Sequence, residues 1–336
     1  MRVAVFSAKA YDRRFLDAAN ATYGHAIDYF DAHLDAATAP LAAGYAAVCV
    51  FVNDRLDAAT LEAIAAAGVG TVALRCAGYN NVDLAAAEAL GITVVRVPAY
   101  SPEAVAEFTL GLILAVDRNI PRAWNRVREN NFALDGLIGR NLSSRVAGVV
   151  GTGRIGALVA RMLRLGFGCQ VLASDVVEDP DLVAADVRYV PVETLLREAD
   201  LISLHCPLTP DTRHLIDARA IDQARPGVVI VNTSRGALID TNALIDGLKS
   251  RKIGGVALDV YEQEADLFFE DLSNEIIQDD VFQRLLTFPN VLITGHQAFL
   301  TEEALGAIAR TTLGSLSEIE AGQAPEHRVL AAAVKG

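Results

Sequence analysis

The sequence predicts an α/β protein made of two Rossmann-like domains, each built on a parallel sheet. Short runs rich in β-branched residues alternate along the chain with segments that are apolar at helical spacing. This alternation is typical of parallel sheets covered by helices on both faces. The 336 residues exceed the size that one hydrophobic core usually organises. The alternation is interrupted near residue 100 by one long helical pattern, which indicates two domains.

Ten apolar runs have the length and composition of strands. They comprise residues 2–7, 46–52, 71–77 and 93–97 before the interruption, and 145–150, 170–175, 201–206, 228–234, 254–260 and 291–294 after it. Segments between them, such as LDAATLEAIAAAG and DTNALIDGLKSRK, carry apolar residues at helical spacing. Each half of the chain is therefore expected to form its own sheet.

The long helical pattern runs from Pro102 to about Asn130 and begins with Ser101-Pro102, a good pair for the start of a helix. Pro121 predicts a kink or a division into two helices, because proline lacks the backbone N–H of a helix interior. A long helix between two α/β blocks indicates a connector and places a domain boundary near residue 100. Periodicity allows the last helical pattern, 301–322, to pack on either block.

The composition excludes several classes of protein. The formal net charge of −13 argues against a surface for nucleic acid or for an anionic membrane. No charge-free apolar stretch is long enough to span a bilayer, and the N-terminus becomes charged too early for a secretory signal. The four cysteines have no CxxC spacing and no histidine at metal spacing. They predict reduced thiols of a cytoplasmic protein and no metal site.

A glycine-rich loop follows the strand of residues 145–150. Gly151, Gly153 and Gly156 have the spacing GxGxxG and open a helical pattern. In this context the first glycine makes a tight turn, the second lets the backbone approach a pyrophosphate, and the third lets helix and strand pack closely. Asp175 ends the next strand, about 20 residues later, where its carboxylate would accept the ribose hydroxyls and repel a 2′-phosphate. The loop therefore predicts NAD rather than NADP.

Three side chains that could take part in catalysis stand at or after the ends of later strands: Arg235, Glu264 and His296. Ligands of open parallel sheets bind beyond the carboxyl ends of the strands. Arginine can hold a carboxylate in a two-pronged contact, and histidine can give a proton to a carbonyl and take it back. A carboxylate on the other ring nitrogen would fix the tautomer and favour the charged ring. Spacing alone leaves a structural alternative for each residue. Arg235 could be a cation at a helix start, Glu264 a solvated acid in a loop, and His296 a ring packed in the core.

Seven motifs occur in order across nearly the whole chain: GYNNVDL, RVPAYSPEAVAEF, VGTGRIG, SLHCPLTP, VNTSRGALID, GGVALDVYEQEADLFFEDLSNEIIQDDVF and TGHQAFLTEEAL. Together they resemble the D-isomer-specific 2-hydroxyacid dehydrogenase family, and within it the bacterial fermentative D-lactate dehydrogenases. The resemblance implies a flavodoxin-like substrate domain of residues 1–100 and 300–336 and an NAD-binding Rossmann domain of residues 101–299. It also implies a cleft between them for the substrate. Many relatives have histidine where this chain has Phe108, which leaves the local packing between the two domains open.

The resemblance implies roles for individual residues. Arg235 is implied to bind the substrate carboxylate and carbonyl, His296 to be the proton donor and acceptor, and Glu264 to be its acid partner. The small substrate pocket is implied to include Ala77, Gly78, Tyr100 and Phe299. Cofactor contacts are implied for Gly151, Gly153, Arg154, Ile155, Gly156, Asp175, Cys206, Pro207, Thr212, Thr233, Ser234 and Asp259. Asp259 is also implied to support the arginine and the nicotinamide.

The implied reaction is the reversible reduction of pyruvate to D-lactate by NADH. The segment 124–145 resembles the arm through which such enzymes dimerise, so a homodimer or homotetramer is expected; its charged and Asn residues could equally be solvated surface. Two alternatives stay open: a dehydrogenase for phenylpyruvate or hydroxypyruvate, and an NAD-sensing co-repressor. Tyr100 and Phe299 favour a small apolar pocket. The set of Arg235, Glu264 and His296 favours an enzyme over a co-repressor.

Overall fold

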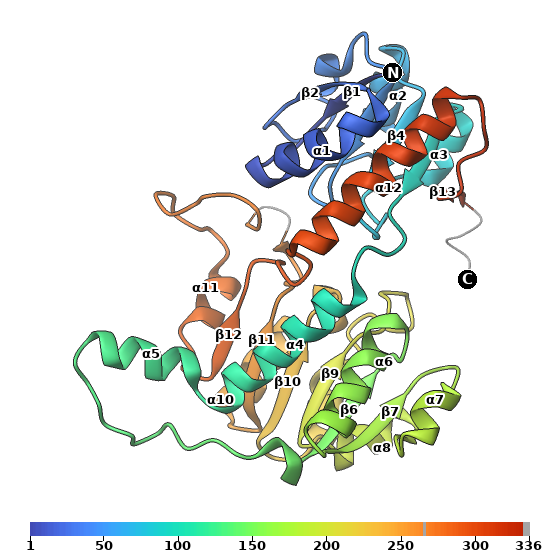
Figure 1. Cartoon of the computed structure of the whole chain (residues 1–336). Helices are drawn as coiled ribbons and strands as arrows, with labels where there is room; N and C mark the ends of the chain where they lie inside the picture. The colour runs from blue at the N-terminus through green and yellow to red at the C-terminus, as the bar shows by residue number, and fades with distance from the viewer. Residues whose placement is uncertain (265–266, 332–336) are drawn as a thin grey trace. The chain divides into compact units, whose positions relative to one another are not determined.

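The computed structural model describes residues 1–264 and 267–331 (Figure 1). Backbone contacts divide the chain into two units, Met1–Ser101 with Leu300–Gly336, and Pro102–Phe299. Both units are α/β structures on mainly parallel sheets, which confirms the predicted fold class. Of the helices in the described residues, none combines the length and the apolar character needed to cross a membrane.

Unit 1, the discontinuous unit, contains a six-stranded sheet in its described part, with the order β13-β5-β4-β3-β1-β2. Its strands are β1 (Arg2–Val5), β2 (Ala26–Tyr29), β3 (Ala47–Val50), β4 (Thr71–Leu74), β5 (Thr93–Arg96) and β13 (Arg328–Val329). Its helical elements are α1 (Ala10–Tyr23), η1 (Ala39–Ala42), α2 (Ala58–Ala66), α3 (Leu84–Ala89) and α12 (Glu302–Glu320). Neighbouring strands are parallel, except that β13 runs antiparallel to β5.

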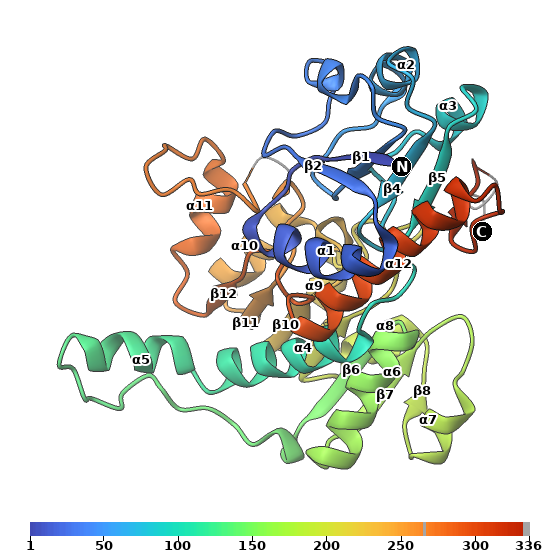
Figure 2. The ribbon, with the colours of Figure 1, turned by 45° about the horizontal axis from the view of Figure 1, so that its top comes forward.

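The last long helix packs on the sheet of unit 1. Leu313 and Leu316 of α12 share one core with Leu16 of α1 and with Val3 and Val5 of β1. The helices α1 and α12 lie side by side (Figure 2). The structure thus resolves the choice that helical periodicity left open.

Unit 2 contains, in its described part, a seven-stranded parallel sheet with the order β12-β11-β10-β9-β6-β7-β8. Its strands are β6 (Val146–Val150), β7 (Gln170–Ser174), β8 (Arg188–Tyr189), β9 (Leu201–Leu204), β10 (Val228–Asn232), β11 (Ile253–Leu258) and β12 (Val291–Ile293). Its helical elements are α4 (Pro102–Asp117), α5 (Ile120–Arg128), η2 (Leu142–Ser144), α6 (Arg154–Arg161), η3 (Met162–Gly166), α7 (Pro180–Ala184), α8 (Val192–Glu198), α9 (Ala218–Gln223), η4 (Gly236–Leu238), α10 (Thr241–Lys249) and α11 (Asp280–Leu286). The strand order reverses between β6 and β9, which makes their carboxyl ends the expected ligand-binding edge.

Both faces of this second sheet are buried. Val229 and Val231 of β10 join the core beneath α4 and α6, whereas Val228 and Ile230 join the core beneath α8 to α11. The alternation follows from the two-residue repeat of a strand. Figure 1 shows α4 and α6 in front of the sheet. Phe108 of α4 packs against the first of these cores.

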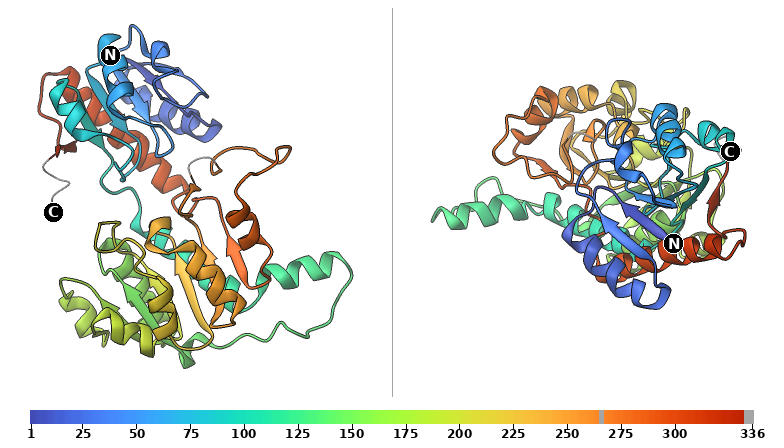
Figure 3. Two further views of the ribbon diagram at one scale, coloured as in Figure 1. Left: turned by 180° about the vertical axis from the view of Figure 1, so that it is seen from behind. Right: turned by 90° about the horizontal axis from the view of Figure 1, so that it is seen from above.

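The long pattern of residues 102–130 forms two helices. The helix α4 begins at Pro102 and ends at Asp117, and α5 begins at Ile120 with Pro121 in its first turn. Asn119 between them has a left-handed backbone with a φ of 53°. The expected division therefore occurs just before the proline, which is tolerated at a helix start. Helix α5 and the segment after it project from unit 2 in both views of Figure 3.

Three short strands are absent from the prediction. The strands β2, β8 and β13 lie at sheet edges and have four, two and two residues. An edge strand is half solvated and needs no continuous apolar run, so β2 could carry Asp28 without losing its place in the sheet.

Candidate active site

The carboxyl ends of the strands in unit 2 bring the predicted cofactor and catalytic residues to one edge of the sheet. Following β6, β7, β9, β10, β11 and β12, this edge carries Gly151, Asp175, Cys206, Arg235, Asp259 and His296. Because all these strands are parallel, residues from distant parts of the sequence meet there. Arg235 and His296 follow β10 and β12, which flank β11 and Asp259.

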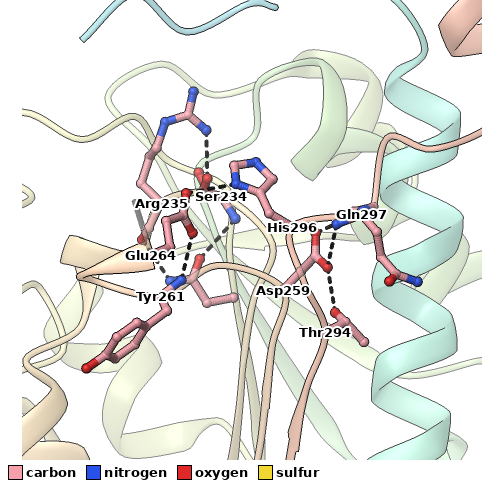
Figure 4. A network of polar contacts seen from close by, with 10 residues as sticks. Ser234, Arg235, Asp259, Tyr261, Glu264, Thr294, His296 and Gln297 are labelled. Carbon is pink, nitrogen blue, oxygen red and sulfur yellow. Dashed lines mark hydrogen bonds and ion pairs between the residues drawn. The ribbon is translucent and has the colours of Figure 1, made fainter. Parts of the chain in front are cut away.

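The imidazole of His296 is paired with the carboxylate of Glu264. The Nδ1 atom of His296 lies 2.8 Å from Oε1 of Glu264 (Figure 4). The other carboxylate oxygen, Oε2, accepts the backbone N–H of Tyr261 at 2.9 Å. With Nδ1 engaged, Nε2 is the ring nitrogen left for a substrate. Such a pair holds the ring in one tautomer and orientation, which is the arrangement needed for directed proton transfer.

The backbone beneath His296 is held by Asp259, whose carboxylate is fully buried. Its Oδ1 accepts Thr294 Oγ1 at 2.5 Å and the N–H of Gln297 at 2.9 Å, and its Oδ2 accepts the N–H of Ala298 at 2.8 Å. The N–H of His296 donates to the Asp259 carbonyl at 2.7 Å. His296 itself has a left-handed φ of 51°, an uncommon conformation that surrounding bonds must maintain. In the described structure, Asp259 thus supports the histidine segment.

The guanidinium of Arg235 lies on the same side of the strand ends as the His296 ring (Figure 4). Its Nη1 donates to the carbonyl of Ser234 at 2.7 Å. Gly236 follows, and a Cβ there would lie 2.1 Å from the carbonyl carbon of Tyr261. Glycine is therefore required where the arginine loop passes the chain leading to Glu264. This close passage brings the arginine and the acid into one site.

The glycine loop fits a dinucleotide. Gly151 has a φ of +88°, and a Cβ on Gly156 would lie 1.8 Å from the Gly151 carbonyl oxygen, so the fold itself requires both glycines. A Cβ on Gly153 would meet nothing within 4 Å. Protein packing therefore does not explain the glycine at position 153, whereas close approach of a pyrophosphate does. Gly153 is also the N-cap of α6, and Arg154 and Ile155 begin that helix, whose first N–H groups suit an anion.

Asp175 is held beside this loop. Its Oδ2 accepts the N–H and the hydroxyl of Thr152 at 2.5 and 3.1 Å, and its Oδ1 accepts the N–H of Val176 at 2.6 Å. The Tyr189 hydroxyl donates to Thr152 Oγ1 at 2.9 Å. The exposed carboxylate therefore has a defined position next to the glycine-rich turn.

The other predicted cofactor residues lie on the loops after β9 and β10. The Ser234 hydroxyl donates to the Cys206 carbonyl at 2.8 Å, and the Thr212 hydroxyl donates to the Pro207 carbonyl at 2.6 Å. The hydroxyl of Thr233 lies 2.8 Å from that of Thr109 in α4. Burial raises the pKa of the Cys206 thiol to about 11. The thiol is therefore protonated and uncharged at neutral pH and is a poor nucleophile.

Ala77, Gly78 and Tyr100 belong to unit 1 and follow β4 and β5. The carbonyl of Ala77 accepts Arg96 Nη1 at 2.8 Å, and the carbonyl of Gly78 accepts Cys76 Sγ at 3.2 Å. Both carbonyls are thus engaged, whereas no described residue accepts the N–H of Ala77 or Gly78. Phe299 is buried at the end of unit 2.

Sequence reasoning missed two residues around His296. Thr294 has a hydroxyl bonded to Asp259, and Phe269 has a ring against the imidazole. Phe269 stands in the run LFFED and reads as ordinary core. The signal that could have drawn attention to Phe269 is its position five residues after the candidate acid Glu264.

Known proteins resemble this chain along nearly its full length. The family described as D-isomer specific 2-hydroxyacid dehydrogenase, NAD binding domain, matches residues 110–298. A 2-hydroxyacid dehydrogenase homolog 1 of Schizosaccharomyces pombe is 54% identical over 95% of this chain and 96% of its own length. A D-lactate dehydrogenase of Escherichia coli is 52% identical over 96% of this chain and 98% of its own length.

Solved structures agree with these sequence matches. The apo-structure of D-lactate dehydrogenase from Escherichia coli matches with a TM-score of 0.89 and covers 98% of this chain and 100% of its own. A structure described as the pyruvate reductase of Chlamydomonas reinhardtii matches with a TM-score of 0.92 at 43% identity and covers 97% of this chain and 98% of its own.

Proposed function

The chain belongs to the D-isomer specific 2-hydroxyacid dehydrogenase family, and from this premise we propose that it is a D-lactate dehydrogenase that reduces pyruvate with NADH. It is an NAD-dependent oxidoreductase of 2-hydroxy acids. The observation that carries the finer proposal is the pair of His296 and Glu264 beside Arg235 at one edge of the sheet.

The guanidinium of Arg235 binds the carboxylate of pyruvate in this proposal. A planar fork matches a carboxylate with two parallel hydrogen bonds, which a single ammonium cannot provide. The family resemblance assigns further donors for the same carboxylate to the backbone N–H groups of Ala77 and Gly78. The family resemblance assigns the pocket wall for the methyl group to Tyr100 and Phe299.

His296 provides the proton. Bound NADH supplies the hydride that is added to the carbonyl carbon. Nε2 of the charged imidazole gives its proton to the carbonyl oxygen, so the ketone becomes an alcohol and the ring becomes neutral. Glu264 holds Nδ1 and balances the charge of the ring before transfer. In the reverse direction the neutral ring takes the hydroxyl proton back.

The names of the relatives support pyruvate as the substrate and the D configuration of the product. Proteins called D-lactate dehydrogenase and pyruvate reductase match nearly all of this chain. A dehydrogenase for a bulkier 2-keto acid, such as phenylpyruvate or hydroxypyruvate, is the second candidate.

A homodimer or homotetramer fits the exposed apolar face of α5. Ile120, Trp124 and Val127 are exposed at a spacing that places them on one side of this helix. We propose that this face packs against a second copy of the chain. The cysteines of the chain are free and buried, which supports the proposed cytoplasmic location.

The test is NADH oxidation by the purified protein with pyruvate, phenylpyruvate and hydroxypyruvate, followed by NAD reduction with D-lactate and L-lactate separately. We expect the highest kcat/KM with pyruvate and reverse activity with D-lactate alone. A higher kcat/KM with phenylpyruvate or hydroxypyruvate would favour the second candidate. Reverse activity with L-lactate would contradict the proposed stereochemistry.

A further inference from the structure

Two adjacent phenylalanines after Glu264 have different surroundings. Phe268 is 7% exposed, and its ring meets that of Phe282 edge-on at 6.0 Å between centroids. Phe269 is half-buried beside the same core, and its ring lies against the imidazole of His296. Packing in the core explains why an aromatic ring stands at position 268. At position 269 the ring contacts both this core and the imidazole, so core packing is only part of the explanation.

The contact between Phe269 and His296 is direct. Their ring centroids are 5.6 Å apart with an interplanar angle of 42°. This separation lies within the range of favourable aromatic pairs. Phe269 also has a left-handed φ of 71°, which is a genuine outlier for a bulky side chain. A strained backbone that delivers a ring to a candidate catalytic group points to a role at that group.

The local chain geometry joins this ring to the acid. The N–H groups of Leu267 and Phe268 donate to the Glu264 carbonyl at 3.0 and 2.9 Å, so both residues lie close to Glu264. Residues close together in the chain therefore make two contacts with the same imidazole: the carboxylate of Glu264 at Nδ1 and the ring of Phe269 at its side.

We propose that Phe269 is a positioning residue for His296, and that its ring and the Glu264 carboxylate together hold the imidazole with Nε2 directed at the substrate. The inference rests on the proposed function, since it assigns this ring a part in proton transfer. A carboxylate alone leaves an imidazole free to swing about the shared hydrogen bond. An aromatic ring against its side removes that freedom and excludes water from that side.

Four variants test the proposal. Phe269→Leu removes the ring and keeps an apolar side chain. Phe269→Asn removes the ring and relieves the backbone, because asparagine tolerates a left-handed φ. Phe269→Tyr keeps the ring and serves as the rescue. Phe268→Leu is the matched control, because it removes the adjacent ring, which packs against Phe282 in the core.

We expect Phe269→Leu and Phe269→Asn to lower kcat for pyruvate reduction roughly tenfold to a hundredfold, as misplacement of a catalytic group does. The dissociation constant for NADH should stay within about twofold, and Phe269→Asn should unfold at the same or a higher denaturant concentration than the wild type. Loss of activity without loss of stability separates positioning from a structural role. Phe269→Tyr should keep at least about a third of wild-type kcat, and Phe268→Leu should keep kcat in its folded fraction.

A second readout needs no activity. In NMR spectra of protein labelled at the ε1 carbon of histidine, the His296 signal is identified by its absence in His296→Asn. Its chemical shift should change in Phe269→Leu and stay the same in Phe268→Leu. Wild-type kcat and an unshifted signal in Phe269→Leu would overturn the proposal, as would an equal loss of kcat in Phe268→Leu. If the wild type does not reduce pyruvate, the proposed function fails, and the His296 signal still decides whether the ring holds the imidazole.

Discussion

The carboxylate of Glu264 lies 2.8 Å from Nδ1 of His296, although 32 positions separate the two residues in the sequence. The contact joins the turn after β11 to the segment after β12. Because these two strands are parallel neighbours, the pair is a product of the sheet and not of local sequence.

Replacing Glu264 with glutamine should slow turnover. The amide keeps a hydrogen-bonding group at Nδ1 of His296 but carries no negative charge, so the bond to the ring is weaker and holds it less firmly. We expect kcat/KM for pyruvate reduction to fall roughly tenfold to a hundredfold. Initial rates of both proteins at saturating NADH measure this, and an unchanged kcat/KM would remove Glu264 from its proposed role.

Replacing His296 with asparagine should abolish most of the turnover while cofactor binding remains. Asparagine tolerates the left-handed φ of 51° at this position, so the variant removes the proton donor without straining the backbone. General acid catalysis of this kind contributes roughly a hundredfold to ten-thousandfold. Steady-state turnover and an NADH fluorescence titration measure the two quantities. Near-native turnover in a folded variant would show that another group provides the proton.

Replacing Arg235 with lysine should raise the KM for pyruvate much more than it changes NADH affinity. The ammonium keeps the charge but loses the planar fork, so it cannot make the two parallel charge-assisted bonds to the carboxylate. We expect at least a roughly tenfold increase in KM, which corresponds to about 1.4 kcal/mol of lost interaction. Initial rates over a range of pyruvate concentrations provide the measurement. An unchanged KM would contradict carboxylate binding by Arg235.

Two glycines of the cofactor loop should respond differently to alanine. Gly153→Ala places a Cβ in open space, so we expect unfolding free energy to change by less than about 0.5 kcal/mol and NADH to bind more weakly. Gly156→Ala places a Cβ 1.8 Å from the Gly151 carbonyl oxygen and should destabilise unit 2. Thermal melts with and without NADH distinguish the two effects. Unaltered NADH affinity in Gly153→Ala would show that the pyrophosphate does not lie against this glycine.

His205 should make the fold less stable in mild acid. Burial lowers the pKa of His205 to about 4, below the value of about 6.5 in an unfolded chain. Between these values the unfolded chain binds the proton and the folded protein does not, so stability is fully present above pH 6.5 and is lost as the pH falls toward 4. The slope for this one group is about 1.4 kcal/mol per pH unit. Urea unfolding at several pH values in this range gives the free energy of unfolding as a function of pH. That free energy should depend less steeply on pH in His205→Gln than in the wild type, and equal dependence would contradict the assignment.

The fold class could be predicted from the sequence because strand and helix periodicities alternate cleanly, and NAD could be predicted because a glycine loop, a helix and Asp175 follow one another in the required order. Arg235 and His296 could be placed after strands for the same reason, and their roles stay predictions. The left-handed backbones of His296 and Phe269 could not be predicted. The backbone of His296 depends on bonds to Asp259, which is distant in sequence, and no periodic pattern marks the position of Phe269. The edge strands β2, β8 and β13 were missed because half-exposed edge strands lack the continuous apolar runs that mark the buried strands.

Unit 1 is interrupted by the whole of unit 2, and this has a consequence for synthesis on the ribosome. Residues Met1–Ser101 emerge first, but α12, which covers their core with Leu313 and Leu316, emerges about two hundred residues later. At synthesis rates of about 5 to 20 residues per second, the apolar face formed by β1 and α1 stays uncovered for about 10 to 40 seconds. Unit 2 is continuous and can complete its sheet within that interval. The nascent first unit is therefore the part of this protein with the greatest need for a chaperone.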